Sequence, residues 1–282
     1  MNYRHGFHAG NAADVFKHYV LCLILTSLKA KPAPFFVLDS HAGAGGYRFS
    51  PGGEQEWGIG RLWKERTRWP ALAEYLRIVA HHNPADGRLM RYPGSPLIIR
   101  ALLRPEDRAT FVERHPEEHA ALHALLKDDQ RLAVHLGDGW KLINAFTPPP
   151  EHRGLVLIDP PYEQRSDFDE VAQALARGRR HWRGGIYCAW YPIKSGEPVR
   201  TFLRTVSQFA PEALAVHLFT LPRDVDNRLN GSGLLIINPP WKLGSTLTTS
   251  LPPLASRLAH DARHGHVIIA PAGEMARAMG RR

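Results

Sequence analysis

Short apolar, β-favouring runs alternate with helical patterns along most of this chain, and that alternation limits the fold more than any other feature of the sequence. Asn11 is a suitable N-cap with Asp14 three residues later, so a helix is expected over 12–30. Strands that alternate with helices pair in parallel and carry helices on both faces of the sheet. The sequence therefore predicts an α/β, Rossmann-like doubly wound fold. The expected strands are 35–39, 109–113, 131–136, 154–159, 185–192, 213–221, 233–238 and 266–270, with further helices at 116–127, 139–146 and 167–178.

One segment, 48–92, interrupts this alternation. It has helical spacing and carries Trp57, Trp63 and Trp69 among several arginines and lysines. We expect a small inserted helical subdomain here, with 1–47 and 93–282 forming the main domain. Tryptophans at such spacing more often form a small core than stacking platforms for bases, whereas the Arg and Lys residues around 61–68 are expected to contact phosphate.

Charge and cysteine content narrow the partners and the compartment. The net charge of +9 and the pI near 9.8 favour a polyanionic partner, and nucleic acid before a membrane, with an unspecialised basic surface as the alternative. Cys22 and Cys188 lie far apart in apolar runs, which is typical of reduced, packed thiols in a cytosolic protein. The apolar run 19–28 is too short to span a bilayer, and no signal peptide is recognisable. We expect a cytoplasmic monomer.

Glycines or acidic side chains follow three consecutive expected strands, at the point where each strand ends. Glycines let the backbone turn sharply and approach a ligand, and an acidic residue after the second strand commonly binds ribose hydroxyls. Each feature alone is common in loops, but their order predicts one pocket along the carboxyl edge of the sheet. The residues are Asp39 with Gly43, Gly45 and Gly46 after the first strand, Glu113 after the second, and Asp138 and Gly139 after the third.

The fourth strand ends in "LIDPPYE" (157–163). Proline fixes its own φ and donates no ladder hydrogen bond, so the turn is rigid and leaves the sheet at once. The carboxylate of Asp159 is therefore expected at the strand end where open α/β sheets place their ligands.

A second Pro-Pro motif, "NPPW" (238–241), competes with "DPPY" (159–162). Strand order favours Asp159, because that motif follows the fourth strand and faces a pocket over the first. "NPPW" comes about three strands later, which we expect to be near the far edge of the sheet. Asn238 and Trp241 are then structural closure or a pocket wall.

The order of these motifs resembles S-adenosylmethionine-dependent methyltransferases that modify exocyclic amino groups, which carry an (Asp/Asn/Ser)-Pro-Pro-(Tyr/Phe/Trp) motif after the fourth strand. Over nearly the whole chain the sequence resembles the bacterial 23S ribosomal RNA adenine-N6 methyltransferases of the RlmJ family. The resemblance implies a class I methyltransferase fold, S-adenosyl-L-methionine as methyl donor, and the adenine at position 2030 of 23S ribosomal RNA as substrate. The blocks that carry it are "YRHGFHAGNAADVFKH" (3–18), "LDSHAGAGGY" (38–47), "YPGSPL" (92–97), "LIDPPYE", "WYP" (190–192) and "INPPWKL" (237–243).

The resemblance also implies roles for individual residues. Asp159 would be the catalytic acceptor, and Tyr3 and Lys17 would serve the RNA, although a flexible basic terminus and a solvated lysine are the ordinary interpretations of the last two. Tyr162 would stack on an adenine swung out of its own stack. The residues implied to line the cofactor site are His18, His41, Ser95, Glu113, Asp138, Gly139 and Asp159.

A mechanism follows as a hypothesis. Asp159 and the carbonyl of Pro160 would accept the two N6 hydrogens, aim the nitrogen lone pair at the methyl group, and stabilise the cation that forms. The alternatives are an amino methyltransferase acting on DNA or on a protein glutamine, and a non-catalytic RNA-binding protein on a methyltransferase scaffold.

Metal and other catalytic chemistry find little support in the sequence. His115, His119 and His123 recur every fourth residue, but a solvated histidine face is the better interpretation and we expect no metal. No G-x-S-x-G elbow and no redox cysteine pair are present, so hydrolase and oxidoreductase classes lack their chemistry.

Overall fold

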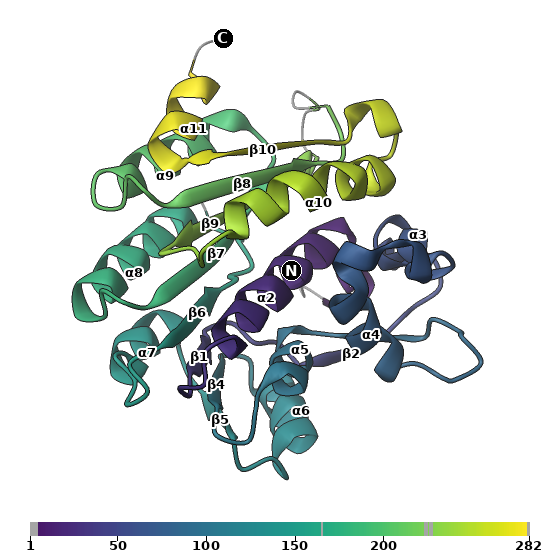
Figure 1. Ribbon diagram of the computed structural model, residues 1–282, viewed down its shortest axis with the longest axis horizontal. Helices are drawn as coiled ribbons and strands as arrows, with labels where there is room; N and C mark the ends of the chain where they lie inside the picture. Colours follow the sequence, from purple (N-terminus) through teal and green to yellow (C-terminus); the bar gives the residue numbers. More distant parts are fainter. Residues whose placement is uncertain (1–4, 165, 223–224, 226–227, 281–282) are drawn as a thin grey trace.

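The computed structural model describes residues 5–164, 166–222, 225 and 228–280, which form a three-layer α/β fold around one eight-stranded sheet (Figure 1). The strand order is β10-β8-β9-β7-β6-β1-β4-β5. The expected fold class is confirmed. The strands are β1 (Phe36–Asp39), β4 (Arg108–Glu113), β5 (Leu132–Leu136), β6 (Gly154–Ile158), β7 (Ile186–Ile193), β8 (Leu214–Phe219), β9 (Gly231–Ile237) and β10 (His266–Pro271).

Strand direction changes at one side of the sheet. β5, β4, β1, β6 and β7 are parallel, as the alternation with helices predicts. That pairing does not extend to β9, which lies antiparallel between β7 and β8. Only residues 220–230 separate β8 from β9, with no helix among those that the structure describes, and so short a connection without a crossover helix pairs strands antiparallel. β10 also pairs antiparallel with β8.

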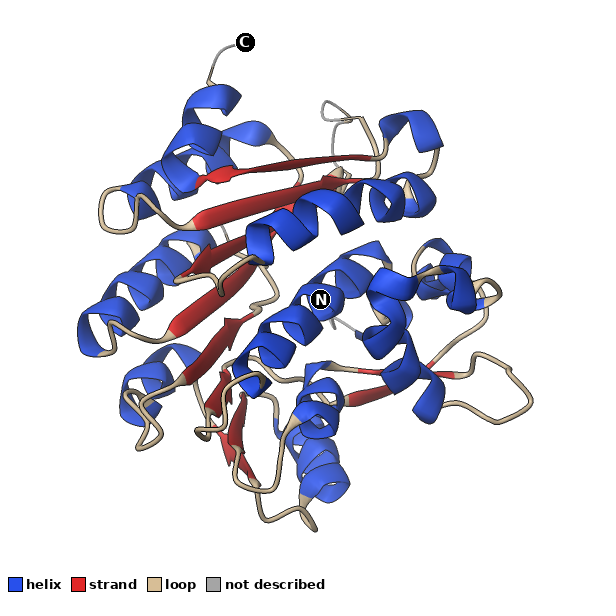
Figure 2. Cartoon of the chain, in the orientation of Figure 1, coloured by secondary structure: helices blue, strands red, loops and turns tan. Residues whose placement is uncertain are grey.

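Alternate side chains of the strands belong to two separate hydrophobic cores, one on each face of the sheet. Leu155 and Leu157 of β6 belong to one core, and Val156 and Ile158 to the other, since successive residues of a strand point to opposite faces. Figure 2 shows helices on both sides of the sheet, as expected. The first core is covered by α2 (Ala12–Lys29), α5 (Ser95–Leu102), α6 (Pro116–Leu126) and α10 (Leu243–Leu258), and the second by α7 (Gly139–Phe146), α8 (Asp167–His181), α9 (Gly196–Ser207) and α11 (Ala272–Met279).

The helix α2 begins where the sequence predicts. The side chain of Asn11 accepts a hydrogen bond from the backbone N–H of Asp14 at 3.0 Å. Asp14 returns the interaction by accepting from the N–H of Gly10 at 2.9 Å. These reciprocal bonds satisfy N–H groups that the first turn of a helix leaves without partners. They also fix the start of α2 beside the carboxyl edge of the sheet.

The segment 48–92 is mainly helical, as expected. It lies between two short antiparallel strands, and its buried side chains, such as Leu62 and Tyr75, belong to the same hydrophobic core as α2. Trp63 is buried there, whereas Trp57 is 46% exposed and stacks on His260 with ring centroids 4.5 Å apart. The elements are β2 (Gly46–Arg48), η1 (Glu54–Trp57), α3 (Ile59–Trp63), η2 (Arg66–Arg68), η3 (Pro70–Leu72), α4 (Ala73–His81) and β3 (Arg91–Pro93), preceded by the single turn α1 (His5–His8).

None of the helices in the described part of the chain has the length and apolarity that crossing a bilayer requires.

Candidate active site

The first strand ends in a carboxyl group that is fully buried. Asp39 has no exposed surface, and it accepts a hydrogen bond from the Ser95 hydroxyl at 2.7 Å. Burial raises the pKa of Asp39 to about 7, even though the Ser95 hydrogen bond acts in the opposite direction. Ser95 is a predicted cofactor residue. Asp39, which accepts its hydrogen bond, is predicted as the end of the first strand but not as a cofactor residue.

The glycine turn after β1 is tied to the end of β4. The backbone N–H of Gly43 donates to Glu113 at 2.8 Å, and the N–H of His115 donates to the other carboxylate oxygen at 2.7 Å. Gly43 and Gly45 have φ angles of +62° and +80°, a region that favours glycine. The predicted convergence of the first two strand ends is therefore present.

The third strand end approaches the same turn. Asp138 caps α7 by accepting from the N–H of Trp140 at 3.0 Å. Gly139 is packed so closely that a Cβ there would lie 2.1 Å from the carbonyl oxygen of Ser40. The ring of His41 lies 4.6 Å from that of Trp140, and burial lowers the pKa of His41 to about 4, so the imidazole is neutral near pH 7. These contacts bring His41, Asp138 and Gly139 together, as predicted.

Lys17 reaches this edge from α2. Its ammonium contacts the carboxylate of Asp159, and it lies 3.1 Å from a carboxylate oxygen of Asp14. The residue is 6% exposed, so the interpretation as a solvated lysine is wrong. Burial alone would lower the pKa of Lys17, but the two neighbouring carboxylates hold that pKa above its ordinary value. An ion pair from α2 therefore fixes Asp159.

The turn after Asp159 anchors its tyrosine. Tyr162 has a φ of +50°, and its hydroxyl donates to the carbonyl of Trp190 at 2.8 Å. Its ring centroid lies 4.9 Å from that of Phe168 and 5.7 Å from that of Trp190. The Lys17 ammonium is 5.9 Å from the centroid of the Trp190 ring. Trp190 thus joins Lys17 and Tyr162. It lies in the "WYP" block, for which no separate role was predicted.

His18, another predicted cofactor residue, lies next to Lys17 in a buried aromatic network. Its Nδ1 is 2.8 Å from the Tyr92 hydroxyl, and the two rings stack with centroids 5.5 Å apart. The Tyr92 hydroxyl is in turn 2.9 Å from that of Tyr75. Tyr3, the other predicted RNA residue, lies outside the described residues.

The second Pro-Pro motif lies at the amino ends of the parallel strands, opposite the ends where Asp159 lies. The side chain of Asn238 donates to the carbonyls of Arg183 at 2.8 Å and Gly185 at 2.7 Å, just before β7 begins. Because β9 is antiparallel and internal, the expected position near the far edge of the sheet is wrong. Asn238 closes the turn before β7. Trp241 is 86% exposed and forms no pocket wall.

The three histidines of α6 form no metal centre with neighbouring groups. The rings of His119 and His123 stack with centroids 6.1 Å apart. In the described portion of the chain, no group of three or more His, Cys, Asp or Glu side chains is arranged to hold a metal ion.

Known proteins with similar sequence and structure carry names that agree with this site. Residues 32–270 match the family described as "Ribosomal RNA large subunit methyltransferase D, RlmJ". Ribosomal RNA large subunit methyltransferase J from Escherichia coli is 40% identical over 95% of this chain and 98% of its own. The protein of that name from Haemophilus influenzae is 39% identical over 93% and 95%. The crystal structure of protein LPL1258 from Legionella pneumophila superposes with a TM-score of 0.89 at 33% identity, covering 94% of this chain and 98% of that one.

Proposed function

The chain belongs to the RlmJ family of ribosomal RNA large subunit methyltransferases, and we propose that it transfers a methyl group from S-adenosyl-L-methionine to N6 of the adenine at position 2030 of 23S ribosomal RNA. The observation that carries the proposal is the position of Asp159. It follows β6 in a Pro-Pro turn, next to the strand that ends in Asp39, and it is held by Lys17.

The side chains at the carboxyl edge have the chemistry that the methyl donor requires. S-Adenosylmethionine carries positive charge on its sulfur and its amine, hydroxyls on its ribose, and an aromatic base. Burial makes Asp39 costly to ionise and raises its pKa to about 7, and a bound cation would stabilise its ionised form. Glu113 suits ribose hydroxyls, and Asp138 and the His41 ring lie at the same edge of the sheet. These residues therefore fit the donor.

Asp159 prepares the nitrogen of the acceptor. Lys17 engages one carboxylate oxygen, Oδ2, and no hydrogen bond within the described residues uses the other. That oxygen and the carbonyl of Pro160 can accept the two N6 hydrogens. Accepting both draws the nitrogen out of conjugation with the ring and directs its lone pair at the methyl group. When bound, the donor supplies that methyl group on a positively charged sulfur.

The same carboxylate stabilises the product side of the transfer. Positive charge develops on N6 as the bond forms, and a fixed carboxylate stabilises that charge more in the transition state than in the ground state. The positively charged N6 that results from methylation is acidic, so its proton passes to Asp159 even though Asp159 is not a strong base. Tyr162, anchored through its hydroxyl to Trp190, offers its ring to the swung-out adenine. A cytoplasmic location follows from a ribosomal RNA substrate.

A methyl-transfer assay tests the proposal. Purified protein, labelled S-adenosylmethionine and 23S ribosomal RNA lacking the modification are combined, and the product is mapped by nucleotide. Label on N6 of adenine 2030 is the expected result. Label on DNA or on a protein glutamine instead, or donor binding without any transfer, would overturn the proposal.

A further inference from the structure

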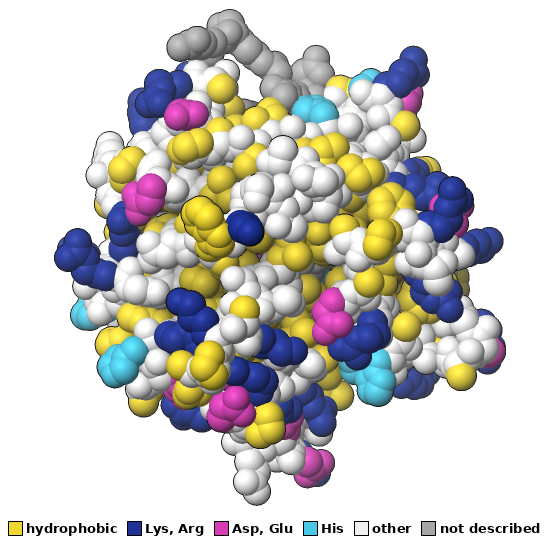
Figure 3. All heavy atoms as spheres, viewed as in Figure 1, with side chains coloured by type: hydrophobic (Ala, Val, Ile, Leu, Met, Phe, Trp, Pro, Cys, Tyr) yellow, Lys and Arg dark blue, Asp and Glu magenta, His cyan; other side chains and the backbone are white. Residues whose placement is uncertain are grey.

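The exposed face of α10 and the turn before it carry hydroxyls and cations but no carboxylate. Residues 239–260 include no Asp or Glu. Figure 3 shows no acidic side chain over α10, whereas Lys and Arg gather at the neighbouring margin over α3. Such a surface attracts a polyanion without repelling it at any point along the helix. The exposed residues of this strip include Trp241, Lys242, Ser245, Thr246, Thr249 and Arg257.

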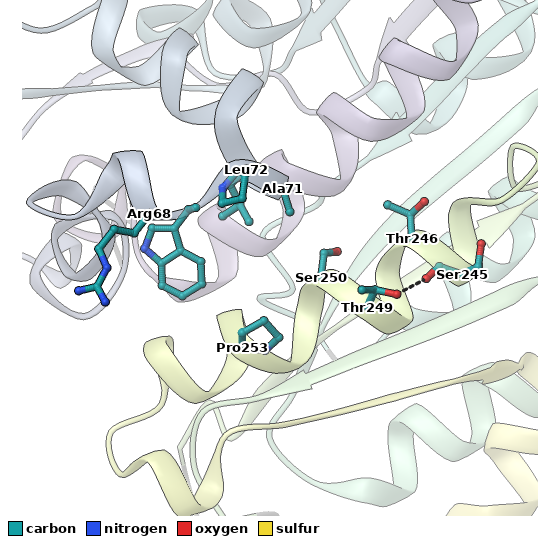
Figure 4. Close-up of a pocket in the computed structure, with 10 residues that line it drawn as sticks. Arg68, Ala71, Leu72, Ser245, Thr246, Thr249, Ser250 and Pro253 are labelled. Carbon is teal, nitrogen blue, oxygen red and sulfur yellow. Dashed lines mark hydrogen bonds between the residues drawn. The ribbon is translucent and has the colours of Figure 1, made fainter.

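A groove of about 600 Å³ runs between this strip and the segment 68–72 of the inserted region. Figure 4 shows Thr249, Ser250 and Pro253 on the α10 side and Ala71 and Leu72 on the other. Trp69 also lines the groove, and the Arg68 side chain at its rim is 77% exposed. No lining residue is acidic. The nearest carboxylate to Arg68 is that of Glu65 at 3.8 Å, and Glu65 also pairs with Arg257.

Trp241 stands at the end of the strip on a rigid turn. It follows Pro239 and Pro240, and it lies between Asn238 and Lys242, which both have positive φ angles. The side chain of Asn238 is anchored by two hydrogen bonds. Strained backbone of this kind persists only where the surrounding structure holds it. The turn therefore holds the backbone of Trp241 in place and leaves its large aromatic ring 86% exposed.

We propose that this groove, together with the strip that continues from it along α10 to Trp241, binds an unpaired stretch of the ribosomal RNA substrate outside the catalytic site. Serine and threonine hydroxyls, lysine and arginine bind phosphate and ribose oxygens, and exposed tryptophan rings stack on unpaired bases regardless of sequence. The lack of carboxylates along both the groove and the strip favours a polyanion over a protein partner. The inference rests on the proposed function, because it assigns a second contact to the same RNA.

The position of the strip sets which nucleotides it meets. β9 ends at the amino edge, so α10 starts there and runs toward the catalytic edge. A helix of 16 residues is about 24 Å long. Trp241 is therefore far from Asp159, and the groove binds nucleotides that flank the target adenine in space rather than the adenine itself.

Thr249→Glu and Trp241→Ala test the site, with Thr248→Glu as the matched control. Thr248 is exposed on the same helix, but it does not line the groove. Affinity is measured with a 23S ribosomal RNA fragment that contains adenine 2030, at several salt concentrations. We expect both groove variants to bind about tenfold more weakly, with KM raised and kcat retained at saturating RNA. Thr248→Glu should stay within about twofold of the wild type, and all variants should keep the wild-type Tm and affinity for S-adenosylmethionine.

Wild-type affinity in both groove variants would overturn the inference while leaving the proposed function intact. Self-association of the wild-type protein that Thr249→Glu abolishes would also overturn it, because a second copy would then cover the groove. Failure of the wild-type protein to methylate ribosomal RNA would instead reject the proposed function.

Discussion

The ammonium group of Lys17 contacts the carboxylate of Asp159, and both groups are largely buried. The same ammonium lies 3.1 Å from Asp14, in the first turn of α2. The helix α2, which precedes β1 in the chain, thereby holds the turn that follows β6, the fourth of the parallel strands. Because these groups are shielded from water, removing Lys17 would leave two buried carboxylates without compensation. The position of the Asp159 carboxylate therefore depends on how α2 begins.

Asp159→Asn should remove most of the catalytic power with little change in shape. The amide cannot stabilise positive charge on N6, so kcat should fall by about 10²- to 10³-fold or more. Single-turnover methylation of ribosomal RNA measures this loss. Affinity for S-adenosylmethionine, measured by calorimetry, should be weakened but not lost. Turnover within tenfold of the wild type would contradict the assignment.

Asp14→Asn tests whether Asp14 positions Lys17. Asparagine can still accept from the N–H of Gly10, but it carries no charge for the ammonium. The free energy of unfolding should fall by about 1–3 kcal/mol, the usual range for a lost charged hydrogen bond, and kcat should fall about tenfold. Chemical denaturation and the methylation assay give the two values. Asp86→Asn, at an exposed loop position where the carboxylate pairs with Arg88, is the control and should change neither; an unaltered Asp14→Asn would remove the positioning role.

The buried carboxyl of Asp39 should make stability depend on pH. Its pKa in the folded protein is about 7, above the value near 4 of an unfolded chain. Between these values the folded protein keeps a proton that the unfolded chain has lost, so this group's contribution to stability declines as pH rises from about 4 to about 7, and is constant above. Denaturation of the wild type and Asp39→Asn across this range isolates the contribution. The difference in unfolding free energy between the two should change with pH in that window, and a constant difference would contradict the raised pKa.

Asn238→Ala should affect stability but not catalysis. The change removes two hydrogen bonds to the turn before β7 and places alanine at a φ of +54°. We expect a loss of about 1–3 kcal/mol in the free energy of unfolding and a wild-type kcat per folded molecule at saturating RNA. Asn238→Gly removes the side chain but tolerates the backbone angle, so it should recover part of that loss. A fall in kcat comparable with that of Asp159→Asn would show that the second motif takes part in the reaction.

Much of the fold could be predicted because buried strands are recognisable in a sequence as short apolar runs. The runs around Val37, Val156 and Cys188 are apolar and bounded by turn residues, so their positions and order follow from the sequence. The direction of β9 is harder to predict, because it depends on whether a loop or a helix precedes the strand. The sequence does show a glycine-containing loop between the expected strands 213–221 and 233–238, and that loop was the available signal.

The site was predictable where it depends on strand ends, and less so where it depends on contacts between distant segments. Glu113 and Asp138 follow their strands directly, so their convergence with the glycine turn follows from parallel pairing. The burial of Lys17 does not, because a lysine in the first turns of a helix is ordinarily solvated. Asp39 was visible as a strand end, but only its contact with Ser95, across the inserted segment, reveals that it supports the cofactor residues.

Because β9 runs antiparallel to β7, the two Pro-Pro motifs lie at opposite ends of the strands and have separate roles. Asn238 lies beside the start of β7, and Asp159 lies beside Trp190 of the same strand, about four residues or 13 Å further along. The direction of β9 alone therefore keeps two similar tetrapeptides, "DPPY" and "NPPW", at opposite ends of the strands. A probe or affinity handle attached at Asn238 would leave the chemical step at Asp159 unchanged once RNA is saturating, whereas a loop grafted after β6 would destroy that step.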